Sequence, residues 1–212
     1  MKKILIPLAV FSLWTGVSST QAASTVDLSV TGVITPSACN PTLSNGGVYD
    51  LGKISARDLN TDQPTQLPAH NLQLTLTCEA LTLVALKPSD NRAGSAYEGD
   101  KSVKFGLGLV NGNEKLGSMT LYLESIVADG ATMYAIGSVG SSSTEWAPAA
   151  IMSPHFLTSF TLSRNVPDLV PTQIQQLTAD VLIEPRIAPA NTLTLNTEVP
   201  IDGSATLELN YL

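Results

Sequence analysis

Short runs in which apolar and polar residues alternate recur along almost the whole chain, while a helical spacing of apolar residues is nearly absent. A period of two places the apolar side chains on one face of a β-strand. The pattern predicts an all-β fold with enough strands for a two-sheet sandwich. The alternating runs cover residues 26–34, 72–78, 103–109, 119–123, 156–162, 177–183, 193–195 and 205–211.

Gly, Pro, Asn and Asp separate these runs, as turn residues do between antiparallel strands. The strongest hairpin signal is Asp129-Gly130, a dipeptide that suits two-residue turns. Residues 61–68 and 137–154 predict loops, and only residues 173–176 resemble a short helical turn. Because neither loop looks like a linker between domains, the sequence predicts a single folded domain. Further turns are expected at residues 45–47, 88–91, 111–113 and 202–203.

The first 22 residues have the parts of a secretory signal peptide. Two lysines precede an apolar run over residues 4–17, and Thr20 and Ala22 place small residues at −3 and −1 of a cleavage site. The apolar run is shorter than the ~20 residues that a membrane-spanning helix needs, which disfavours the alternative of an uncleaved anchor. We therefore expect export, cleavage after Ala22, with Ala23 as the alternative, and no membrane span in the mature protein.

Charge and composition exclude several classes of protein. The 212-residue chain carries a formal net charge of −7, and removal of residues 1–22 deletes two lysines and no acid. Such an acidic protein lacks the positive field with which nucleic-acid binders displace counterions from phosphate. With 43% hydrophobic and 14% charged residues the chain is not disordered.

The chain has two cysteines, Cys39 and Cys78. An even pair of cysteines in an exported protein predicts one disulfide, with two free thiols as the alternative. Closing a loop of this length would stabilise the fold by roughly 4 kcal/mol in the chain-entropy account.

No pattern for catalysis or for metal binding is present. His70 and His155 are the two histidines, and neither has the spacing of a metal ligand set. The nucleophile motif Gly-x-Ser-x-Gly does not occur. We expect no enzyme, no cofactor and no metal site.

Two polar features allow alternative interpretations. Residues 90–94 read Asp-Asn-Arg-Ala-Gly, and the simpler interpretation is an Asx-type turn in which Arg92 pairs with a nearby acid. Trp146 is the tryptophan that remains after signal cleavage, in a polar segment. It could anchor a ligand or partner, or it could fold back over the edge of the sandwich.

Both ends of the mature chain carry alternating runs that need a partner strand. Residues 24–34 follow the cleavage site directly, and residues 204–212 alternate up to the carboxyl end. An apolar edge strand with an unpaired side invites another chain to pair with it.

Several spacings resemble the subunits of chaperone–usher fimbriae (pilins) of Gram-negative bacteria. Gly32 lies seven residues before Cys39, the cysteines are 39 apart, residues 48–54 follow the first of them, and Tyr211 is penultimate. Residues 90–94 and the layout of the chain also resemble a fimbrial-like exported family of unknown function that is linked to the β-type fimbriae.

The resemblance implies an immunoglobulin-like sandwich with one disulfide that lacks its final strand, so that a hydrophobic groove stays open. Residues 23–35 would be an N-terminal donor-strand extension, and residues 36–212 one pilin-like domain. A periplasmic chaperone, and after transfer at the outer-membrane usher the next subunit, would each lend a strand to the groove. The implied donor residues are Val26, Leu28, Val30, Gly32 and Ile34, and the implied edge that faces the chaperone or subunit is formed by Leu207, Leu209 and Tyr211.

The expected function is therefore a structural subunit of a surface fimbria, which passes through the periplasm and polymerises by donor-strand exchange with like or unlike subunits. Two departures keep an alternative open. The mature chain is longer than a usual rod subunit, with no role assigned to residues 138–154, and the donor run lacks the usual small residue unless Ala23 or Ser24 supplies it. Residues 24–34 would in that alternative pair within their own chain, giving a self-complemented, adhesin-like binding module.

Overall fold

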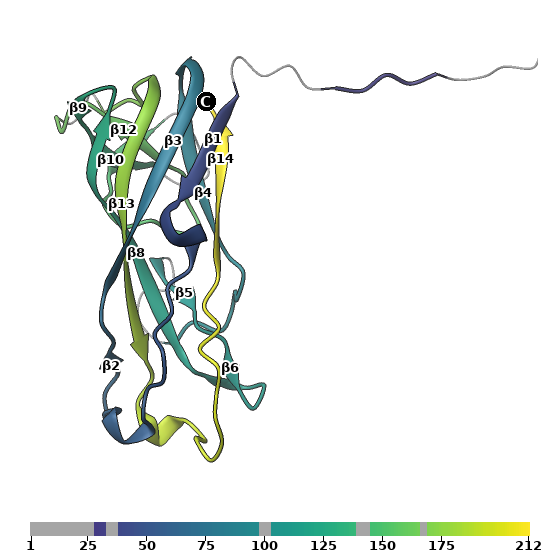
Figure 1. The fold of residues 1–212 in the computed structure, drawn as a ribbon, viewed down its shortest axis with the longest axis vertical. Coiled ribbons are helices and arrows are strands. Elements are labelled where there is room, and N and C mark those ends of the chain that lie inside the picture. The colour runs from purple at the N-terminus through teal and green to yellow at the C-terminus, as the bar shows by residue number, and fades with distance from the viewer. Residues whose placement is uncertain (1–27, 33–37, 98–102, 139–144, 166–168) are drawn as a thin grey trace, which may run out of the picture. The chain divides into compact units, whose positions relative to one another are not determined.

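The structure is a computed structural model that describes residues 28–32, 38–97, 103–138, 145–165 and 169–212. The chain divides into two compact units, Met1–Ile34 and Thr35–Leu212. In the first unit the described residues 28–32 form no strand. The expected signal peptide, residues 1–22, lies outside the described residues. The second unit is the folded domain that follows (Figure 1).

Two antiparallel sheets form the layers of this domain. The first has the order β1-β3-β13-β8-β5, with β2 also paired to β13 and β9 to β8. Its strands are β1 (Cys39–Leu43), β2 (Thr65–Gln66), β3 (His70–Thr82), β5 (Phe105–Gly106), β8 (Gly117–Ala128), β9 (Ala131–Thr132) and β13 (Ile174–Ile187).

The second sheet has the order β11-β10-β12-β4-β14. Its strands are β4 (Val84–Asp90), β10 (Tyr134–Ser138), β11 (Trp146–Pro148), β12 (Thr158–Thr161) and β14 (Ala205–Tyr211). A separate small hairpin joins β6 (Leu109–Val110) to β7 (Glu114–Lys115). The short helical turns are the 3₁₀ elements η1 (Ser44–Gly47), η2 (Ala56–Asp58) and η4 (Ala190–Thr192).

The core lies between the two sheets. In β3 the buried side chains alternate with exposed ones, so that Leu72, Leu74 and Leu76 face inward. The second sheet meets them with Leu86 and Phe160, both of which are almost fully buried. Burial of such side chains on both inner faces is what holds a sandwich together. The all-β sandwich expected from the sequence is confirmed.

The predicted hairpin at Asp129-Gly130 is also confirmed. This turn joins β8 to β9, and both of its residues have positive φ, 50° and 82°. That conformation is the one that makes Asp-Gly favourable in a two-residue turn.

Several local predictions are wrong in detail. Residues 173–176 form no helical turn, because β13 begins at Ile174. Residues 193–195 form no strand but follow η4 as irregular chain, and residues 103–109 contain two short strands instead of one. The expected loop over 137–154 contains the end of β10 and all of β11, which places Trp146 in a strand; the loop over 61–68 contains β2.

Candidate functional site

A groove with a volume of about 1010 Å³ opens between two stretches of chain that are far apart in sequence. Residues 43–59, which continue from β1 through η1 and η2, form one wall. Residues 195–207, which lead into β14, form the other. Sheet side chains that point to the core, among them Leu72, Leu121 and Val181, also line the groove. The groove therefore gives solvent access to the apolar interior.

The strand order explains why the domain is open at this place. In an immunoglobulin-type sandwich, strands A, B, E and D form one sheet, and strands C, F and G form the other. Here β1, β3, β13 and β8 follow the order A-B-E-D, while β4 and β14 are neighbours as C and F are. Among the described strands none occupies the place of G beside β14, so the second sheet ends there.

β14 therefore has one edge paired with β4, and among the described strands none pairs with its other edge. β14 pairs with β4 from Ala205↔Asp90 to Tyr211↔Val84. Figure 1 shows β14 in yellow running beside β1 in dark blue, and these two strands are the edges of their sheets. The free backbone groups of such an edge are a template for one more strand.

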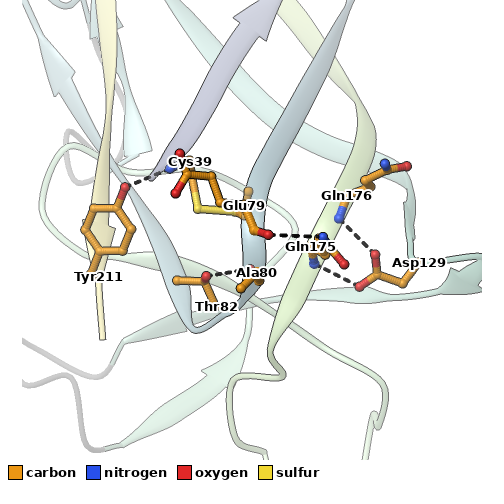
Figure 2. Close-up of a disulfide and its surroundings, with 9 residues drawn as sticks. Cys39, Glu79, Ala80, Thr82, Asp129, Gln175, Gln176 and Tyr211 are labelled. Atoms are coloured by element: carbon orange, nitrogen blue, oxygen red, sulfur yellow. Dashed lines mark hydrogen bonds between the residues drawn. A yellow bond between two sulfur atoms is a disulfide. The ribbon is translucent and has the colours of Figure 1, made fainter. Parts of the chain in front are cut away.

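A hydrogen bond and the disulfide lie at one end of this pair of edges. Tyr211 in β14 accepts a hydrogen bond on its hydroxyl oxygen from the backbone N–H of Cys39 in β1, with a donor–acceptor distance of 3.0 Å (Figure 2). Cys39 is directly opposite Cys78 in β3 and is bonded to it, with an S–S distance of 2.06 Å. The predicted disulfide is confirmed. Neither Cys39 nor Tyr211 is among the residues that line the groove.

An ion pair connects the two walls of the groove. Lys53 Nζ lies 2.8 Å from Glu198 Oε1, and the two residues are 145 positions apart. Both side chains are about 90% exposed. Exposed pairs of this kind contribute little to stability, so this pair does not hold the walls at a fixed separation.

A stronger polar arrangement holds the second wall at Asp202, shortly before β14. Arg92 donates two hydrogen bonds to Asp202, from Nε to Oδ2 at 2.8 Å and from Nη2 to Oδ1 at 2.7 Å. These hydrogen bonds are the main reason that the pKa of Asp202 lies below its ordinary value, and they raise the pKa of Arg92. Asp90 Oδ1 accepts the N–H of Arg92 at 2.8 Å, an Asx turn. The interpretation of residues 90–94 as such a turn with a paired arginine is confirmed.

The residues expected to form the interaction edge fall into two groups. Leu207 lines the groove and packs against the core, whereas Leu209 packs against the core without lining the groove, and Tyr211 accepts the hydrogen bond from Cys39 outside the groove. Of the expected donor residues, Leu28 and Val30 are 90% and 89% exposed, and Gly32 has no atom within 4 Å of the position that a Cβ would take. Val26 and Ile34 lie outside the described residues.

Sequence reasoning missed most of the wall residues. Leu51, Ile54, Leu59, Val199 and Ile201 pack in a second small cluster near the groove. Their spacing has no period, because the chain is irregular over most of 48–64 and 193–204. The sequence did contain one indication of them, because these five apolar residues stand in segments that are otherwise polar and rich in turn residues.

The other candidate residues do not gather into a site. His70 begins β3 and stacks on Tyr49 with the ring centroids 4.4 Å apart, and His155 is exposed in a turn. Trp146 in β11 is opposite Ser138 in β10. Over the described residues no group of His, Cys, Asp or Glu could hold a metal ion. The same residues include no helix long and apolar enough to cross a membrane.

Known proteins resemble this chain over nearly its whole length. Residues 28–104 match the family described as "Protein of unknown function (DUF1120)". The chain is 28% identical to "Uncharacterized protein YhcF" of Escherichia coli (strain K12), over 92% of this chain and 93% of that protein. It is 25% identical to "Protein GltF" of the same organism, over 88% of each. Neither of these two names states an activity.

Proposed function

We propose that this protein is a structural subunit of a surface fimbria that polymerises by donor-strand exchange. The observation that carries the proposal is the apolar groove beside β14, at the place where an immunoglobulin-type sandwich would have its last strand. A strand added there would form backbone hydrogen bonds with the free edge and place alternate side chains in the groove.

The N-terminal segment has the properties of such a strand. Val26, Leu28 and Val30 alternate with polar residues, Ile34 falls on the same period of two, and the described apolar members are exposed. The eight steps from residue 26 to residue 34 span about 27 Å when extended. The segment therefore has the extended reach and the alternating pattern of a strand that fills a groove.

The partners follow from an exposed apolar groove. Before assembly it would be an aggregation hazard, so a chaperone that lends a strand would protect the subunit during its passage through the periplasm. At the outer-membrane usher, residues 24–34 of the next subunit would replace the chaperone strand. The expected destination is a fimbria on the cell surface.

The test alters only the donor segment of the intact exported chain. Leu28→Asp with Val30→Asp gives a donor-disabled chain, because two charges would enter the apolar groove. Ser29→Asp with Thr31→Asp is the matched control, since it adds the same charge to the other face of the strand. All three chains are expressed with a cognate chaperone and usher, and multimers are resolved on an unboiled denaturing gel.

We expect a ladder of multimers from the parent chain and from the control, and none from the donor-disabled chain. Ladders from all three chains would refute donor-strand exchange through residues 24–34. A single, heat-resistant monomer band from the parent would instead favour the self-complemented binding module.

A further inference from the structure

The segment that leads into β14 has two faces with different partners. Ile201, Gly203, Ala205 and Leu207 line the groove. Asp202 and Thr206 do not, and their side chains are bonded to the turn that follows β4. Ser204 is an exception, because it lines the groove as well, so the alternation is complete only from Ala205, where β14 begins.

The residues just before β14 depend on that turn for their position. The ladder between β14 and β4 starts at the pair Ala205↔Asp90. Before it, Asn91 donates its N–H to the carbonyl of Ser204 at 3.0 Å, and Asp202 donates its N–H to the carbonyl of Leu107 at 3.2 Å. Ser204, which also borders the groove, accepts the Asn91 side-chain amide on its hydroxyl at 2.9 Å.

Arg92 is the strongest of these attachments. Its guanidinium donates one hydrogen bond to each carboxylate oxygen of Asp202, at 2.7 and 2.8 Å. This two-pronged geometry fixes the orientation of the Asp202 side chain as well as its distance from Arg92. The turn that carries Arg92 is itself held, because Asp90 accepts the N–H of Arg92 on one oxygen and the N–H of Gly106 on the other. Arg92 therefore connects the groove wall to a fixed part of the sandwich.

The consequence concerns which face the wall presents. A slip of one residue in a strand reverses its two faces, and here it would turn Asp202 into the apolar groove. A carboxylate there would lose hydration without gaining a partner. We propose that Arg92, through Asp202, is a positioning residue that holds residues 201–204 in the register and direction needed to accept a donor strand. This inference rests on the proposed function, because the accepted strand is residues 24–34 of another copy.

The experiment uses the intact exported chain in its donor-disabled form, so that its groove is free for a labelled peptide of residues 23–35. Arg92→Met removes the charge and both hydrogen bonds. Arg92→Lys keeps the charge but not the two-pronged geometry. Arg164→Met is the matched control, because it removes an arginine that stacks on Tyr134 at 4.0 Å, and neither residue lines the groove.

Two quantities are measured, the rate of peptide uptake by fluorescence anisotropy and the hydrogen exchange of the amides of 201–204. We expect Arg92→Met to slow uptake about tenfold, because an acceptor that is no longer preorganised must pay ordering entropy on binding. Arg92→Lys should fall between Arg92→Met and the parent. Exchange should accelerate at 201–204 in Arg92→Met while that of 206–211 stays as in the parent.

Equal uptake rates and equal exchange in Arg92→Met and Arg164→Met would overturn the inference, and so would an acceleration spread evenly over the whole of β14. If the donor-disabled chain with Arg92 unchanged takes up no peptide, the proposed function fails. The exchange comparison still decides whether Arg92 positions the wall, so the two failures are distinguishable.

Discussion

The backbone N–H of Cys39 donates a 3.0 Å hydrogen bond to the hydroxyl of Tyr211, a residue 172 positions further along the chain. The two residues lie in β1 and β14, which are the edge strands of different sheets. Cys39 is in addition bonded to Cys78 in the neighbouring strand β3 (Figure 2). The first residue of β1 is therefore joined to β3 by a covalent bond and to β14 by a hydrogen bond.

Tyr211→Phe removes that hydrogen bond and keeps the ring. We expect the free energy of unfolding to fall by about 0.5 kcal/mol, at the low end for one hydrogen bond because water can replace the hydroxyl at this exposed site. Urea denaturation of the donor-disabled chain measures the change. Tyr134→Phe is the control, because the contact of its ring with Arg164 is retained. Equal losses in the two variants would show that the Cys39–Tyr211 bond contributes nothing.

Reduction of the Cys39–Cys78 disulfide should lower the free energy of unfolding by about 4 kcal/mol in the chain-entropy account, because the bond closes a loop of 39 positions in the unfolded chain. The measurement compares urea midpoints with and without a thiol reductant. The double variant Cys39→Ala, Cys78→Ala should unfold at the same midpoint in both solutions. A midpoint of the parent that does not move with reductant, once loss of the disulfide is verified by mass, would contradict this expectation.

The fold class could be predicted because alternation is a local signal. β3 and the middle of β13 show it clearly, since one face of each meets the core and the other does not. β4 was missed for the opposite reason. It lies between β12 and β14, and it begins with three consecutive buried residues, Val84, Ala85 and Leu86. A continuous apolar run cannot be assigned by period alone, and Pro88 in the same strand suggested a turn.

The groove could be predicted only in part. The alternation of residues 205–211 indicated an edge strand, and Leu207 does line the groove. The walls were not predictable, because residues 43–59 and 195–201 acquire their neighbours from the tertiary fold and not from a repeating pattern. Asp202 likewise has no local partner, since Arg92 is 110 positions away.

Gly203 and Gly117 differ in the space available for a side chain, and this predicts different costs of substitution by alanine. A Cβ at Gly203 would lie 2.6 Å from Leu107 Cδ2, the end of a side chain that can move. At Gly117 it would meet the backbone carbonyl of Arg186 in β13, which cannot move without disturbing the sheet. We expect a loss of about 1 kcal/mol for Gly203→Ala and about 3 kcal/mol for Gly117→Ala, both by urea denaturation.

The variants Gly203→Ala and Gly117→Ala should also differ in the rate at which they take up the donor peptide. Displacement of Leu107 pushes a groove-lining side chain, so Gly203→Ala should slow uptake of the 23–35 peptide beyond what its small loss of stability explains. Assayed at a temperature where both variants remain folded, Gly117→Ala should take up the peptide at a rate closer to that of the parent. The reverse order of rates would contradict the location of the donor site.

Acid should weaken the attachment of the groove wall through Asp202. Because hydrogen bonding to Arg92 holds the pKa of Asp202 below its ordinary value, the ionised form stabilises the folded state. That contribution is complete above the unfolded pKa, about 3.9, and is lost as the pH falls through the lower folded pKa. The acid-induced fall in urea midpoint between pH 6 and pH 3 should therefore be smaller in Asp202→Asn than in the parent.

Asp58→Asn, at an exposed aspartate of η2, is the matched control and should follow the parent. An acid response of Asp202→Asn equal to that of Asp58→Asn would mean that the Arg92–Asp202 pair is not coupled to folding, since both partners are partly exposed and water would then supply what the pair provides.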